Sequence, residues 1–116
     1  MMATAGNIAL KTRRDLSFMR EASRHVGEIL LEVRERIRPG VTTKELGDVA
    51  SRAIQERGVQ SSFLGYQPQG LPKYPATICI SVNEEIVHGI PGPRVLQEGD
   101  IVGLDFGVSG NGWHGD

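Results

Sequence analysis

The sequence predicts an α+β domain in which two amphipathic helices are followed by short antiparallel strands. Three observations lead to this prediction. Apolar residues recur at spacings of three and four over residues 16–37, a second stripe of this kind covers residues 46–54, and β-rich runs bounded by turn residues begin at residue 77. The chain has 116 residues, which is enough for one hydrophobic core and too few for two domains.

The two helices have recognisable ends. The first is expected from about residue 13, and Pro39-Gly40 should stop it because proline cannot continue the hydrogen-bond ladder. Residues 1–12 show no periodicity, so we expect a flexible arm there. The sequence Thr-Thr-Lys-Glu at residues 42–45 has the spacing of a capping box, which predicts the start of the second helix. Gly58 is the expected stop of that helix.

The remainder of the chain is predicted to be loop and strand. Residues 59–75 combine glycine and proline with three aromatic side chains, a composition that opposes regular structure. Strands are expected at residues 77–82 and 101–108, with a further short one at residues 86–87.

Composition excludes several classes of function. Thirteen basic and fourteen acidic residues give a net charge of -1, so the chain lacks the positive field that nucleic acid or an anionic membrane would attract. The single cysteine, Cys79, cannot form an internal disulfide, and no apolar run approaches the roughly 18 residues of a membrane span. We therefore expect a cytoplasmic protein without nucleic-acid or membrane binding of its own.

Two aspartates at the end of the chain carry the strongest chemical signal. Residues 100–116 are typical of a β-hairpin, and Asp105 should point away from the apolar face, between two glycines. A turn at Gly110-Asn111 would place Asp105 opposite Asp116, whereas a turn at Asn111-Gly112 would make them diagonal neighbours. Either register brings the carboxylates within about 4.5 to 8 Å. Carboxylates this close share a proton or hold a cation, unless Asp105 merely caps a backbone group.

Three other residues are candidates with competing interpretations. His114 shares a face with Asp116 in an ideal strand and could be a third ligand, unless Gly115 forms a bulge. His88 could be a structural histidine or a fixed functional imidazole, because the glycine after it permits close approach. Cys79 is by default a small buried apolar residue. Adjacent Glu84 and Glu85 point to opposite faces of a strand and do not suit glycoside hydrolysis, and the glycine spacings match no phosphate-binding motif.

Several segments, in this order, resemble the type I methionine aminopeptidases. They are residues 19–22, 38–46, 81–91 (SVNEEIVHGIP) and 99–102, followed by Asp105 and residues 114–116. The resemblance runs from about residue 12 to the end of the chain. It implies the pita-bread fold, an α+β architecture of two related halves with a two-metal centre between them. Asp105 matches the first metal ligand and Asp116 the aspartate that bridges both metals.

The resemblance also implies a substrate site. His88 matches the histidine that contacts the substrate peptide near the scissile bond. Cys79, Tyr66 and Tyr74 fall where the family lines its methionine pocket, although residues 67–73 form a longer stretch than is usual. No residue of this chain is assigned as catalytic. The implied reaction removes the initiator methionine from nascent polypeptides, with two divalent ions of Co, Mn, Fe or Zn that lower the pKa of water. Ribosome association and a monomeric complete enzyme would fit this role.

The family's remaining ligands, one histidine and two glutamates, belong to its second half. We therefore expect residues 13–116 to be the N-terminal half of the catalytic domain, truncated from a longer product and inactive alone. Two alternatives remain: a non-catalytic pita-bread binding protein, and a hydrolase of the prolidase or aminopeptidase P kind.

Overall fold

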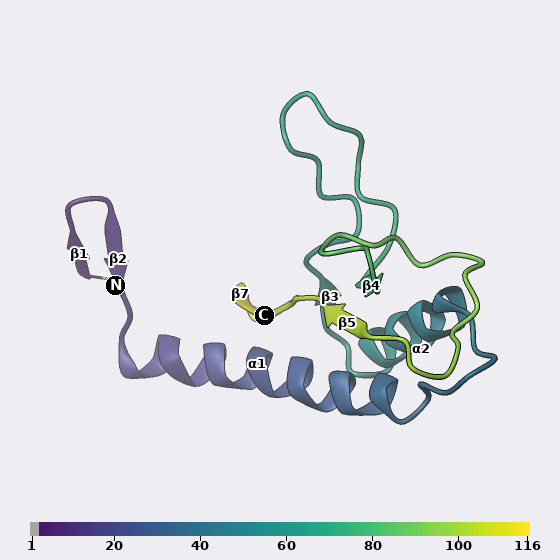
Figure 1. Ribbon diagram of the computed structural model, residues 1–116. Coiled ribbons are helices and arrows are strands. Elements are labelled where there is room, and N and C mark those ends of the chain that lie inside the picture. The colour runs from purple at the N-terminus through teal and green to yellow at the C-terminus, as the bar shows by residue number, and fades with distance from the viewer. Residues whose placement is uncertain (1–2) are drawn as a thin grey trace.

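The computed structural model describes residues 3–116 and has the predicted order of helices before strands (Figure 1). Its elements are β1 (Ala3–Ala5), β2 (Ile8–Leu10), α1 (Arg13–Arg34), α2 (Thr43–Glu56), β3 (Gln60–Ser61), β4 (Cys79–Val82), β5 (Val102–Asp105), β6 (Val108–Gly110) and β7 (Trp113–Gly115). Figure 1 shows α1 along the bottom with the strands above it, α2 at the right, level with β4 and β5, and a long loop between β3 and β4 that projects away from the helices. In the described part of the chain, neither helix is long and apolar enough to cross a membrane.

The expected N-terminal arm contains regular structure that the sequence did not predict. Residues 3–10 form a two-stranded antiparallel hairpin, β1–β2, that stands off the start of α1 in Figure 1. Its turn contains Gly6 in the left-handed conformation, with φ of +64°. Residues 1 and 2, which the prediction also covered, lie outside the described residues. Three-residue strands are too short for periodicity to reveal them.

Both helices begin at capping boxes. Thr42 accepts a hydrogen bond from the backbone of Glu45 while the Glu45 carboxylate accepts one from the backbone of Thr42, which confirms the predicted start of α2. Gly58, with φ of +66°, follows α2 as expected. However, α1 ends at Arg34, several residues before Pro39, because the chain tightens into i to i+3 hydrogen bonds after that point.

The helices bury their apolar stripes against the strands. Four residues of α1 face the core, of which Ile29 and Val33 are completely buried. The buried core also includes Val26, Leu46, Ala50, Ala53, Ile54, Ile78, Ile80, Val82, Leu96, Phe106 and Val108. Strand β4 is buried on both faces, so it runs through the middle of this core.

The strands form separate small sheets. β4 pairs with β5, whereas β6 pairs with both β3 and β7, all antiparallel. The expected continuous strand at residues 101–108 is therefore wrong, since the chain bends at Phe106-Gly107 and changes partner. At the bend, a Cβ on Gly107 would lie 3.0 Å from the carbonyl oxygen of Gly115. The short strand expected at residues 86–87 is also wrong, because both side chains are exposed in an irregular segment.

Candidate functional site

A cleft of about 500 Å³ opens between the long loop and the segment that carries His88. It brings together four of the predicted residues: Tyr66, Tyr74, His88 and Asp105. The full lining is Phe63, Tyr66, Pro68, Leu71, Pro72, Lys73, Tyr74, Pro75, His88, Ile90 and Asp105. A mostly apolar wall with a few convergent polar groups is the usual character of a small-ligand site.

Tyr74 forms the floor of the cleft and is held from several sides. Its hydroxyl donates to two backbone carbonyl oxygens, that of Ile78 at 3.1 Å and that of Gly89 at 3.3 Å. Its ring meets Phe63 edge-on, with 6.3 Å between centroids. The pKa of Tyr74 is raised, chiefly by burial and secondly by the hydrogen bond with the Cys79 thiol. The phenol therefore stays protonated and fixed.

Cys79 lies behind Tyr74 and is not among the residues that line the cleft. It is 3% exposed, which confirms the default interpretation of a small buried residue. Burial raises the pKa of its thiol, the hydrogen bond with Tyr74 opposes that shift, and the charge of Asp105 adds to it. A neutral thiol in this position supports the cleft through Tyr74.

His88 has an unusual backbone conformation at the rim of the cleft. Its φ of +61° lies in the left-handed region, which costs a residue other than glycine roughly 1–2 kcal/mol. The next residue, Gly89, fits against β4 because it has no side chain: a Cβ there would lie 2.1 Å from the carbonyl oxygen of Ile80. The expectation that glycine permits close approach beside His88 is confirmed.

Asp105 ends β5 and is exposed, while Val102 and Leu104 of the same strand are half-buried. This alternation confirms the predicted outward direction of Asp105. Across the ladder Asp105 pairs with Cys79, which connects the carboxylate to the floor of the cleft.

Asp116 follows the hairpin β6–β7, whose register selects between the two predicted turns. Val108 pairs with Gly115, so the turn lies at Asn111-Gly112, where both residues have positive φ. Continued by one residue, this register would set Asp116 against Gly107, diagonal to Asp105. The bend at residues 106–107 interrupts that ladder.

The donors present fit a metal centre only in part. Asp105 and Asp116 are exposed carboxylates, the ligand type that divalent ions use. Yet in residues 3–116 no three His, Cys, Asp or Glu side chains lie close enough together to hold a metal ion. The Nδ1 atom of the His114 ring lies 2.8 Å from the Ser62 hydroxyl. This hydrogen bond leaves Nε2 of His114 free, but among residues 3–116 His114 does not form a three-donor group with the aspartates.

Comparison with known proteins places this chain in a family. The model of metallopeptidase family M24 matches residues 17–116, and the chain belongs to that family. Membership implies a divalent metal cofactor, and the fold is the N-terminal part of the pita-bread architecture.

Particular relatives narrow the similarity to methionine aminopeptidases. Methionine aminopeptidase 1 of Bacillus subtilis is 49% identical over 109 residues, covering 94% of this chain and 42% of the relative. The crystal structure of methionine aminopeptidase from Thermotoga maritima has a TM-score of 0.82 at 35% identity, covering 90% of this chain and 40% of that one. Prolidase from Pyrococcus furiosus, with a TM-score of 0.68 at 15% identity and covering 88% of this chain and 27% of that one, shares the fold alone. The chain thus spans about two-fifths of the length of its methionine aminopeptidase relatives.

Sequence reasoning missed part of the cleft. Leu71 and Ile90 line it and are more than half exposed, yet neither lies in a periodic segment. For Leu71 the available signal was an exposed apolar side chain within a proline-rich loop, and for Ile90 an exposed apolar side chain between His88-Gly89 and Pro91.

Proposed function

We propose that this chain supplies the first part of the active site of a methionine aminopeptidase, which removes the initiator methionine from new proteins. The observation that carries the proposal is the cleft shared by His88, Asp105 and the two tyrosines. The similarity to named methionine aminopeptidases supports it, at 49% identity for the Bacillus subtilis relative and 35% for the Thermotoga maritima structure.

Each part of the cleft has a role in this proposal. The apolar wall receives the unbranched side chain of methionine, which adapts to irregular apolar surfaces. The His88 imidazole at the rim forms a hydrogen bond with the peptide next to the scissile bond. Asp105 and Asp116 supply carboxylate oxygens to a centre of two divalent ions, of Mn, Fe, Co or Zn. Such ions act as Lewis acids and activate water.

The chain alone is not expected to hydrolyse peptides. Two aspartates are too few to hold two ions, and no three-donor group lies in residues 3–116. The same observation suits a non-catalytic binding protein of this fold. We also propose a cytoplasmic location, which the unpaired, buried Cys79 supports because reduced thiols are typical of that compartment.

A chimera tests the proposal. These 116 residues would replace the matching N-terminal part of the Bacillus subtilis enzyme, and cleavage of a Met-Gly peptide and an X-Pro peptide would be compared with added Mn²⁺ or Co²⁺. The proposal predicts metal-dependent release of methionine by the chimera and none by the 116-residue chain alone. A folded chimera without cleavage would favour a binding protein, and preference for the X-Pro peptide would favour the prolidase alternative.

A further inference from the structure

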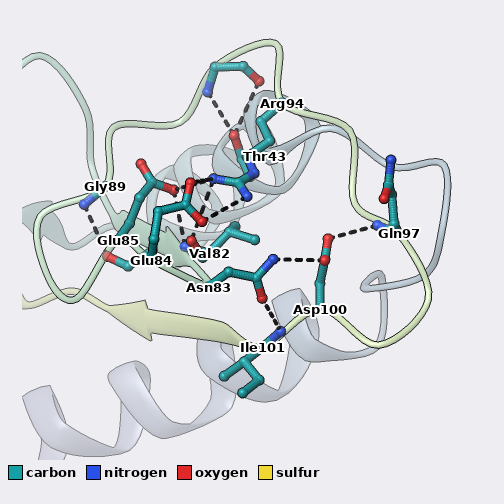
Figure 2. A network of polar contacts seen from close by, with 12 residues as sticks. Thr43, Val82, Asn83, Glu84, Glu85, Gly89, Arg94, Gln97, Asp100 and Ile101 are labelled. Atoms are coloured by element: carbon teal, nitrogen blue, oxygen red, sulfur yellow. Dashed lines mark hydrogen bonds and ion pairs between the residues drawn. The ribbon is translucent and has the colours of Figure 1, made fainter.

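The segment that carries His88, residues 83–94, is irregular yet tied to the fold at both ends. We call it the His88 loop. Figure 2 shows the polar network around it, which joins the end of β4, the start of α2 and the turn before β5. None of the residues labelled in Figure 2 lines the cleft, so direct contact with a ligand in the cleft does not explain this network.

The first tie holds the start of the loop. Asn83 is in the left-handed conformation, with φ of +53°. Its amide donates to the Asp100 carboxylate at 2.9 Å and its side-chain oxygen accepts from the backbone of Ile101 at 2.9 Å (Figure 2). Asp100 is itself fixed by the backbone of Gln97 at 2.8 Å. The turn out of β4 is therefore clamped to the turn into β5.

The second tie holds the end of the loop to α2. The Thr43 hydroxyl accepts from the backbone of Gly92 at 2.9 Å, and the Thr43 backbone donates to the carbonyl oxygen of Arg94 at 3.0 Å. Thr43 is 3% exposed and lies in the first turn of a capped helix, so this anchor is rigid.

The Arg94 side chain connects these ties across the base of the loop. It donates to both oxygens of Glu84, at 2.8 and 3.2 Å, and to Glu85 at 3.4 Å (Figure 2). The Glu85 carboxylate also accepts from the backbone of Val82 at 3.1 Å. A bidentate guanidinium fork fixes direction as well as distance, which a single ammonium group does not.

We propose that Arg94 is a positioning residue for His88. The hydrogen bonds from its guanidinium to Glu84 and Glu85 close the loop and keep the His88 imidazole directed toward the cleft. Without them, the backbone of His88 would leave its left-handed conformation. Glu84 is four residues before His88 and Arg94 six residues after it, with no regular structure between them. Gly89 is bonded to β4 through Ile80 and Ser81, so the fork restrains the remainder of the segment, from Glu84 to His88. Strained residues persist where the surroundings over-determine them, and the fork supplies the closing contact. The inference rests on the proposed function only in taking His88 as the group that meets substrate.

Nitrogen-15 relaxation of the complete 116-residue chain tests this directly. The backbone order parameter of His88 should be about 0.85 in the unchanged chain and fall toward 0.6 in Arg94→Ala. Glu84→Gln, at a side chain that is 73% exposed, should act in the same direction without unfolding the chain. Arg94→Lys should rescue only in part. Arg57→Ala is the matched control, because Arg57 pairs with Glu28 and Glu32 away from the loop and should leave His88 unchanged.

Salt provides a second readout. In 1 M NaCl the Debye length is about 3 Å, so the exposed fork weakens and His88 in the unchanged chain should approach the Arg94→Ala value. An order parameter at His88 that is equal in all variants, with the chain folded, would overturn the inference. These measurements need no peptidase activity, so the proposed function stands or falls separately on methionine release.

Discussion

Replacing Gly89 with alanine should destabilise the fold more than its single methyl group suggests. The new Cβ would lie 2.1 Å from the carbonyl oxygen of Ile80 and 2.9 Å from the Cα of Ser81, and both atoms belong to the backbone. To reach an ordinary contact of about 3.5 Å, residue 89 must move off β4. That movement breaks the hydrogen bond from Ile80 to the Gly89 carbonyl, at 2.8 Å, and the one from Gly89 to the Ser81 hydroxyl, at 3.0 Å.

The magnitude follows from these two bonds. Each contributes about 1 kcal/mol, and the donor of Ile80, a residue that is 1% exposed, would be left unsatisfied at a further cost of about 1–3 kcal/mol. Gly89→Ala should therefore lower the unfolding free energy by about 3–5 kcal/mol, a large share of a typical total. Urea denaturation followed by circular dichroism measures the loss.

Gly92→Ala is the matched control in the same segment. Its Cβ would meet nothing closer than 3.7 Å, so the unfolding free energy should change by no more than about 0.5 kcal/mol. Equal stability of Gly89→Ala and the unchanged chain, or equal losses in both variants, would refute the reasoning.

Three further predictions concern the helices and the floor of the cleft. Gly27→Ala, at an exposed position of α1 with open space around it, should raise the unfolding free energy by about 0.5–1 kcal/mol, and a decrease in urea denaturation would contradict this. Thr42→Ala removes the capping hydrogen bond from the backbone of Glu45 and should lower the unfolding free energy by about 1 kcal/mol in the same assay. An unchanged unfolding free energy would show that the cap is dispensable. The pKa of Cys79 in the folded state is raised above its ordinary 9.0, so the folded state binds the thiol proton more tightly than the unfolded state does. The stability that results is fully present below pH 9.0 and is lost as the pH rises through the pKa of the folded state. Unfolding free energy should thus fall above pH 9.0, less steeply in Cys79→Ala, and identical slopes would contradict the assignment.

Local features of this fold were predictable from the sequence. The capping box at Thr42 and the stop at Gly58 depend on residues within a few positions of each other, so spacing alone reveals them. The outward direction of Asp105 follows equally from strand alternation. The turn before Asp116 was narrowed to two registers, since Asn111 is flanked by glycine on both sides and either dipeptide forms a tight turn.

Features that depend on distant contacts were not predictable. The bend after Asp105 is held by two contacts: Gly107 packs closely against Gly115, and the backbone of Ser62 donates to the carbonyl oxygen of Gly107. No local sequence pattern encodes these contacts. The cleft is also non-local, since a proline-rich loop meets the His88 loop across it. The Arg94 fork is non-local as well, because the chain must fold back after His88 to bring Arg94 to Glu84 and Glu85.

Methionine release by the chimera, measured for Asp105→Asn and Asp116→Asn, tests the central claim most directly. Asp48→Asn is the control, because Asp48 is an exposed carboxylate on α2 that pairs only with Lys44 among the described residues. If Asp105 and Asp116 hold the metal ions, each substitution should reduce the rate by more than the roughly 10–100-fold that loss of an outer-shell partner costs, and Asp48→Asn should have no effect. Undiminished release by either Asp105→Asn or Asp116→Asn would contradict the assignment of that residue to the metal centre.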